Sequence, residues 1–205
     1  MYWYQEDLER LEKEITALKT NPKLIFYGSS TFTLWKELTT VFEEYHPANL
    51  GFGGSTLGAC TWYFDRVFEN IKTPEAIIIY AGENDLGEGR HPEEVILFLE
   101  NLIHKIRTKY GNIPCSFISI KPSFNRWYLK DSIRFTNTTI QKLLSKDSNF
   151  HFIDLFDLML NNEGTPNPKY YIEDGLHLTP AGYQLWTEIL NKHPEIFPLK
   201  KLQKM

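Results

Sequence analysis

The sequence has few of the features that mark secreted, membrane-spanning or disulfide-stabilised proteins. Its 205 residues include only two cysteines, Cys60 and Cys115, at no paired spacing. We interpret both as buried or half-buried thiols in a reducing compartment. No run of about 18 apolar residues indicates a membrane span. The chain is charged from Glu6 onward and lacks the apolar core of a signal peptide, so we expect a cytoplasmic protein.

Clustered basic charge and metal-ligand spacing are also missing. The formal net charge is −4, and apart from Lys200-Lys201 the basic residues are interspersed with acidic ones, which disfavours a nucleic-acid partner. Glu83 and Asp85 lie close together, but no histidine or third carboxylate stands at ligand spacing, so we expect no metal. The loop after the first predicted strand lacks a glycine-rich phosphate cradle, and we expect no cofactor. The oligomeric state is left open.

What is present is the composition of an ordinary globular domain, with 42% hydrophobic and 23% charged residues. At this length one domain can bury a sizeable core. We therefore expect residues 1–205 to form a single domain, with an N-terminal helix over 1–21 packed on it and a frayed tail at 197–205.

Short apolar runs alternate with stretches of helical periodicity along the chain. The run at 76–80 (AIIIY) is continuous rather than alternating, as expected for a strand that helices cover on both faces. A polar, proline-containing loop is expected over 161–173. Strands are predicted over 24–27, 48–51, 76–80, 115–120 and 150–154, and further helices over 33–45, 55–70, 92–110, 126–146 and 180–191.

Five strands that alternate with helices predict an α/β fold, a three-layer α/β/α sandwich around a parallel sheet with right-handed crossovers. In such sheets, ligands bind at the carboxyl ends of the strands, where the strand order reverses. With the order 2-1-3-4-5, the loops after the first three strands lie side by side at that edge. The residues that follow those strands are therefore the candidates for chemistry.

Ser30 follows the first predicted strand in the segment Gly28-Ser29-Ser30, where a serine can act as a nucleophile at a strand-to-helix turn. The alternative is a plain helix cap, and spacing alone does not choose between Ser29 and Ser30. Near the other end of the chain, Asp174 and His177 stand three positions apart. Asp174 can hold the imidazole in the tautomer that leaves Nε2 free as a base, although a loop acid and an unrelated histidine would give the same spacing.

Two further segments supply donors suited to a developing oxyanion. Gly53-Gly54, before a predicted helix, exposes backbone N–H groups, and Asn84, after the third strand, offers a side-chain amide. Each has a plain alternative: a conformational turn for the glycines and a polar turn for 82–85. Asp154, at the end of the fifth strand, competes with Asp174 as the carboxylate partner of the imidazole.

In order and spacing, four blocks of the chain resemble those of the GDSL-type SGNH hydrolases: Gly28-x-Ser30, Asn49-x-Gly51-x-Gly53-Gly54, Gly82-x-Asn84-Asp85 and Asp174-x-x-His177. The blocks span nearly the whole chain. The Gly-Ser-Ser start and the stretch Ser119–Ser123 (SIKPS) are similar to small bacterial members. Ser29 and Thr31 depart from the family pattern, which has Asp and Leu at those positions, but neither belongs to the catalytic set.

The resemblance implies a flavodoxin-like fold and serine-dependent hydrolysis of esters or thioesters. It implies Ser30 as nucleophile, His177 as base and Asp174 as the residue that orients it. The Ser30 N–H, the Gly54 N–H and the Asn84 side chain would form the oxyanion hole. No long insertion offers a lid, so we expect short acyl groups on a small-molecule ester. The alternatives are a thioesterase or lysophospholipase acting on longer chains, and a non-catalytic glycan-binding module.

Three residues after the fourth predicted strand are expected near the same rim. We predict that some of Lys121, Arg126 and Trp127 line the acyl or alcohol pocket. The alternative is that both cations are solvated and Trp127 packs on the long helix that follows.

Overall fold

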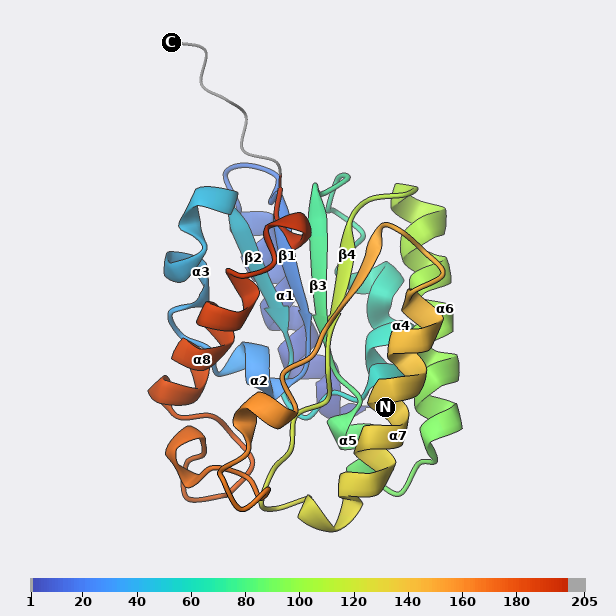
Figure 1. Cartoon of the computed structure of the whole chain (residues 1–205). Helices are drawn as coiled ribbons and strands as arrows, with labels where there is room; N and C mark the ends of the chain where they lie inside the picture. The colour runs from blue at the N-terminus through green and yellow to red at the C-terminus, as the bar shows by residue number, and fades with distance from the viewer. Residues whose placement is uncertain (1, 199–205) are drawn as a thin grey trace.

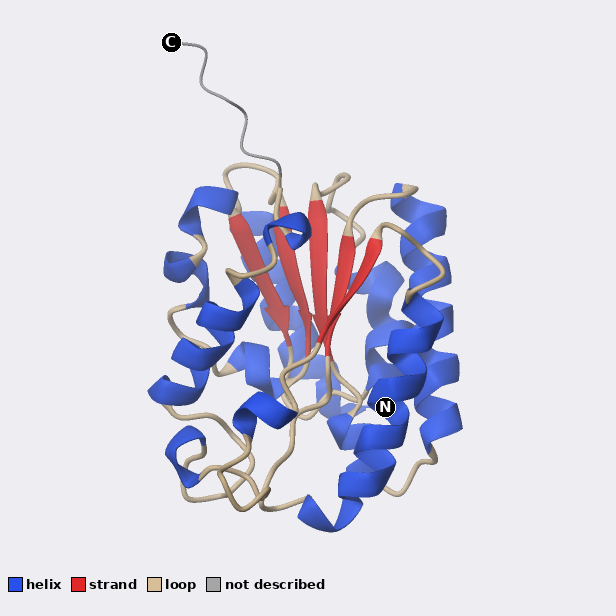
Figure 2. Ribbon diagram, in the orientation of Figure 1, coloured by secondary structure: helices blue, strands red, loops and turns tan. Residues whose placement is uncertain are grey.

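Five parallel strands form one sheet in the order β2-β1-β3-β4-β5, as predicted (Figure 2). The computed structural model describes residues 2–198. The strands are β1 (Leu24–Gly28), β2 (Pro47–Gly51), β3 (Ala76–Tyr80), β4 (Cys115–Ile118) and β5 (Phe150–Ile153).

Helices cover both faces of the sheet and complete the predicted three-layer sandwich (Figure 1). One face carries α2 (Ser30–Thr33), α3 (Leu38–Val41) and α8 (Pro180–Leu190). The other carries α1 (Gln5–Ala17), α4 (Leu57–Val67), α6 (Pro92–Tyr110) and α7 (Lys130–Leu144). The short helix α5 (Glu83–Gly87) follows the carboxyl end of β3.

The continuous apolar run of β3 serves two separate cores. Ile77 and Ile79 pack under α4 and α6, whereas Ile78 and Tyr80 pack under α2, α3 and α8. Every residue of β3 is buried. The absence of alternation in this segment is therefore a consequence of its central place between two helical layers.

Several predicted boundaries differ from the structure. The helix expected over 33–45 is instead α2, α3 and a 3-10 turn at Glu43–Tyr45, and Trp35, buried between the two helices, stacks on Tyr183 at 5.1 Å. The first helix ends at Ala17 because Leu18 is extended. The helix expected from residue 126 begins at Lys130, after a 3-10 turn.

The two ends of the described chain pack on the body of the fold. Helix α1 contributes Leu8 and Leu11 to the core. The sequence predicts fraying from residue 197, but Phe197 is buried and stacks on the Tyr45 ring at 4.6 Å; residues 199–205 lie outside the described part. No helix within 2–198 is long and apolar enough to cross a membrane.

Candidate active site

A close approach between β1 and β3 sets the position of the serine segment. A Cβ on Gly28 would lie 1.9 Å from the carbonyl oxygen of Tyr80, so only glycine fits there. The next N–H, that of Ser29, donates to the same carbonyl at 2.9 Å. The chain then turns into α2, whose first residue is Ser30. This turn holds Ser30 at the carboxyl edge of the sheet.

The structure brings Ser30, His177 and Asp174 into one line of hydrogen bonds. Ser30 Oγ lies 3.1 Å from His177 Nε2, and His177 Nδ1 lies 2.5 Å from Asp174 Oδ2. With the carboxylate ionised, Nδ1 donates to it and Nε2 is left to accept the proton of the serine hydroxyl. In such an arrangement a serine, a histidine and an acid can act as nucleophile, base and orienting acid.

The loop that carries Asp174 holds the carboxylate in its charged form. Its second oxygen, Oδ1, accepts the backbone N–H groups of Leu176 at 2.8 Å and His177 at 2.9 Å. Partial burial opposes ionisation, but the hydrogen bonds from the His177 ring and from these two N–H groups outweigh it and lower the pKa of Asp174 to about 2. The rival Asp154 instead accepts the N–H of Phe156 at 3.0 Å.

Asn49 anchors the carboxyl end of β2 to α2, the helix that carries the serine. Its amide donates to the Phe32 carbonyl at 2.7 Å, and its side-chain oxygen accepts the Gly51 N–H at 3.0 Å. Gly54 adopts a left-handed conformation, with φ of +65°. No hydrogen bond from the N–H of Ser30 or Gly54 to another residue is found within 2–198, so both donors are free for a ligand.

Helix α5 is fastened to the same loop by two side chains. The Asn84 amide donates to the Ser55 carbonyl at 2.9 Å, which fixes one of its two N–H bonds and orients the other. Asp85 is fully buried and accepts the N–H groups of Leu57 at 2.6 Å and Gly58 at 3.2 Å, the first turn of α4. Burial raises the pKa of Asp85, while these two hydrogen bonds lower it.

Lys121 does not line a solvent-accessible pocket, contrary to one expectation, and it is not solvated either. Its side chain is fully buried, and Nζ pairs with Glu83 at 2.7 and 2.9 Å. The same carboxylate also accepts the hydroxyls of Ser123 and Tyr80, each at 3.0 Å. Sequence could not show this inward direction, because a lone lysine after a strand more often points to water.

Arg126 and Trp127 have different surroundings. The Arg126 guanidinium lies against Gly87 at the end of α5, where an added Cβ would be 2.5 Å from Nε. Trp127 is partly buried against the core and stacks on Phe156 at 6.5 Å. The packing alternative therefore describes Trp127 better than a place in the pocket.

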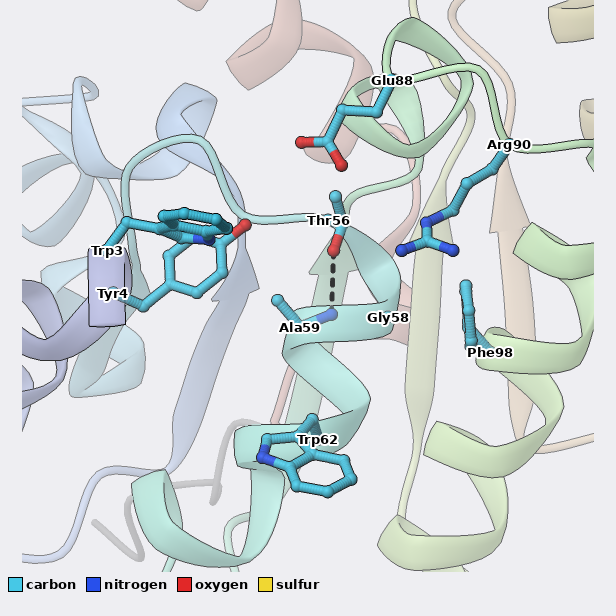
Figure 3. Close-up of a pocket in the computed structure, with 9 residues that line it drawn as sticks. All are labelled: Trp3, Tyr4, Thr56, Gly58, Ala59, Trp62, Glu88, Arg90 and Phe98. Carbon is cyan, nitrogen blue, oxygen red and sulfur yellow. Dashed lines mark hydrogen bonds between the residues drawn. The ribbon is translucent and has the colours of Figure 1, made fainter. Parts of the chain in front are cut away.

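A hollow of about 410 Å³ that the sequence did not predict lies over the start of α4 (Figure 3). Tyr4, at its edge, donates its hydroxyl to the Gly54 carbonyl at 3.2 Å, so the hollow borders the candidate oxyanion loop. Trp62 is 68% exposed there, whereas Trp35 is core. The lining residues are Trp3, Tyr4, Thr56, Gly58, Ala59, Trp62, Glu88, Arg90 and Phe98.

Helical spacing was the signal that could have placed Trp62 outside. Leu57, Cys60 and Phe64 share the buried face of α4, and Trp62 falls on the opposite side. Within residues 2–198, no cluster of three His, Cys, Asp or Glu side chains could hold a metal ion.

Solved structures with this fold cover nearly the whole chain. A protein from Streptococcus pneumoniae is 23% identical, with 93% of this chain and 94% of that chain covered and a TM-score of 0.81. A GDSL-like lipase from Bacteroides thetaiotaomicron is 21% identical, with 92% and 97% covered and a TM-score of 0.77. A lipase/acylhydrolase from Enterococcus faecalis is 19% identical, with 87% and 98% covered and a TM-score of 0.67. At these identities the likeness shows the fold.

Among curated proteins none matches the chain significantly. Residues 25–185 match the GDSL-like Lipase/Acylhydrolase family. This range is well over half of the chain and includes all four of the sequence blocks. The chain belongs to the GDSL-like lipase/acylhydrolase family.

Proposed function

We propose that the protein hydrolyses short-chain carboxylic esters, with Ser30 as nucleophile, His177 as general base and Asp174 as its orienting acid. The observation that carries the proposal is the unbroken line of hydrogen bonds from Ser30 Oγ through the His177 ring to Asp174. Family membership supports ester hydrolysis in general. The particular residues and the short acyl group are the proposed part.

In the first step, Ser30 Oγ attacks the carbonyl carbon of the ester while its proton moves to His177 Nε2. The carbonyl oxygen becomes an oxyanion. When the carbon–oxygen bond to the alcohol breaks, the leaving oxygen takes the proton from His177 Nε2, and the acyl group remains on Ser30. The ionised Asp174 stabilises the transient imidazolium without taking its proton.

In the second step, water attacks the acyl-serine and gives a proton to His177 Nε2. The bond to Ser30 Oγ then breaks, Oγ takes that proton back, and the carboxylic acid leaves. In both steps the oxyanion would receive the N–H groups of Ser30 and Gly54 and the free amide N–H of Asn84. The unused backbone donors and the anchored Asn84 amide support this assignment.

The direct test replaces Ser30 by alanine and measures hydrolysis of p-nitrophenyl acetate. We expect Ser30→Ala to lose nearly all turnover while its circular dichroism and melting temperature stay as in the wild type. A fluorophosphonate probe, which needs an activated serine, should label the wild type and not the variant. Equal turnover by both proteins would refute the assignment.

Labelling also separates this proposal from a non-catalytic glycan-binding role for the same fold. A binding module has no need for a serine hydrogen-bonded to a histidine that is itself held by an acid. If the wild type binds acetylated glycans, leaves their esters intact and escapes the probe, the binding role is favoured.

Longer acyl chains are a second candidate, because the hollow beside the Gly54 loop is lined largely by aromatic side chains (Figure 3). It has the volume to take several methylene groups of an acyl chain. Against it, the described chain has no long insertion that could cover a lipid tail. A series of p-nitrophenyl esters from acetate to palmitate distinguishes the two, and a palmitate optimum would refute the short-chain proposal.

A further inference from the structure

The chain has six arginines, and all of them lie in the described residues. Arg126 differs from the other five. The other five each form an ion pair with an aspartate or glutamate. Arg126 has no acidic partner, and its Nη1 atom is buried without a hydrogen bond to any residue in 2–198. A buried guanidinium nitrogen without a protein partner is energetically costly, so a bound group that accepts a hydrogen bond from it would stabilise this arrangement.

The position of Arg126 puts this unpaired charge between the two halves of the candidate site. Its guanidinium lies against Gly87 of α5, the helix that carries Asn84. The backbone N–H of the preceding residue, Asn125, donates to the Gly175 carbonyl at 3.1 Å, inside the loop that carries Asp174 and His177. The segment therefore joins the oxyanion side of the site to the base.

Two acidic residues of the candidate site, Glu83 and Asp174, already have partners. Glu83 is occupied by Lys121, Ser123 and Tyr80, and its charge is balanced by Lys121. Asp174 is held by the His177 ring and two backbone N–H groups. Neither carboxylate forms an ion pair with Arg126.

We propose that Arg126 binds an oxyanion group of the substrate, a carboxylate or a phosphate carried by the ester. Guanidinium matches both groups through paired, charge-assisted hydrogen bonds. The inference rests on the proposed ester hydrolysis and narrows it from small esters in general to anionic ones. Arg126 is in this view a specificity residue, and the chemical step stays with Ser30 and His177.

The test compares substrates that differ only in charge. On the acyl side, 4-nitrophenyl hydrogen glutarate is paired with its carboxamide analogue. On the alcohol side, 3-acetoxybenzoate is paired with 3-acetoxybenzamide, and 3-acetoxyphenyl phosphate replaces the carboxylate by a phosphate. The measured quantity is the ratio of kcat/KM for the anionic ester to that for its neutral partner, in wild type, Arg126→Met and Arg126→Lys.

We expect the wild type to prefer the anionic ester in one of these arms. Arg126→Met should lower that ratio about tenfold or more, the range for a lost charge-assisted hydrogen bond, and Arg126→Lys should keep part of it. Arg134→Met is the matched control, because Arg134 is an exposed arginine paired with Asp157, and its ratio should not change. Added salt should reduce the wild-type preference.

A purely structural role for Arg126 would lower stability and the rates on both members of a pair together, so the ratio would stay constant. An unchanged ratio in all three arms overturns the proposal. If the wild type hydrolysed no ester, the proposed ester hydrolysis would be refuted. The proposal that Arg126 binds an anionic group would then be tested by binding alone. In this experiment 3-hydroxybenzoate and 3-hydroxybenzamide are titrated into wild type and Arg126→Met, and binding is followed by NMR. The wild type should bind the benzoate more tightly than the benzamide, and Arg126→Met should not. Equal affinity of the wild type for both compounds refutes the proposed role of Arg126.

Discussion

At the scale of single residues, Asp174 and His177 must both be in their deprotonated forms for the proposed reaction. The carboxylate has to be ionised and the imidazole neutral. Because hydrogen bonds lower the pKa of Asp174 to about 2 against the effect of its partial burial, this carboxylate stays ionised throughout the range in which imidazoles titrate. Protonation of Asp174 should therefore not contribute to any loss of activity above about pH 4.

We accordingly expect kcat/KM to fall tenfold per pH unit on the acid side, as one proton binds to the free enzyme. A profile of p-nitrophenyl acetate hydrolysis between pH 4 and 9 measures this. Asp174→Asn should lower kcat by roughly 10²–10⁴, because Asn cannot hold the ring in the required tautomer and charge state. A slope of two on the acid limb would show that a second group takes part.

The same residue predicts a pH dependence of stability. A carboxyl group whose folded pKa lies below its unfolded value stabilises the fold above the unfolded pKa, and the contribution disappears as the pH falls toward the folded pKa. For Asp174 the window therefore runs from about pH 4 down to about 2. Urea unfolding of wild type and Asp174→Asn should give stabilities that converge across this window. A difference in unfolding free energy that stays constant between about pH 4 and 2 would mean that the fold does not lower the pKa of Asp174.

Gly28 and Gly54 make a contrasting pair of tests. A Cβ on Gly28 would overlap the Tyr80 carbonyl, so Gly28→Ala should cost about 3 kcal/mol or more of unfolding free energy or prevent folding. A Cβ on Gly54 meets nothing within 4 Å, and Gly54→Ala should cost only about 1–2 kcal/mol for its left-handed backbone. Denaturant midpoints measure both costs, and equal costs would contradict the steric argument.

At the scale of elements, α5 is held to the start of α4 by Asp85, so this carboxylate positions the Gly54 loop without touching substrate. Asp85→Ala leaves two backbone donors of α4 unpaired and should cost about 2–4 kcal/mol, whereas Asp85→Asn keeps one acceptor and should cost less. Urea denaturation checks the order. Stabilities in the reverse order would mean that packing, not hydrogen bonding, holds the two helices.

The elements also show how far sequence could go. The existence of the strands followed from the alternation of apolar runs with helical patterns, and their order from the flavodoxin-like fold that the resemblance implies. The serine, the glycine loop and Asn84 were expected at one rim because parallel strands end at one edge of the sheet. The break between α2 and α3 did not follow, because burial of Trp35 overrides local periodicity. Side-chain direction was equally hidden: nothing local indicates that Lys121 turns inward to Glu83.

At the scale of the whole molecule, residues from the two ends of the chain and from its middle share one rim of the sheet. His177 approaches Ser30 across 147 positions, and Tyr4 contacts the Gly54 loop across 50. A fold of this kind assembles its candidate site only when the complete sheet is in place. The site and the global fold should therefore be lost together on denaturation.

The hollow at the start of α4 decides how much of a substrate the molecule can enclose (Figure 3). If acyl chains enter it, Trp62→Ala should lower kcat/KM for octanoate and longer esters and leave acetate unchanged, because only a long chain would reach the indole. If the substrate is a short ester, Trp62→Ala should leave the whole chain-length series unchanged, since this exposed side chain contributes little to the core. The measurement is kcat/KM for p-nitrophenyl esters from acetate to palmitate in both proteins. A loss of kcat/KM that is the same at every chain length would mean that Trp62 supports the Gly54 loop, and it would contradict an acyl site in the hollow.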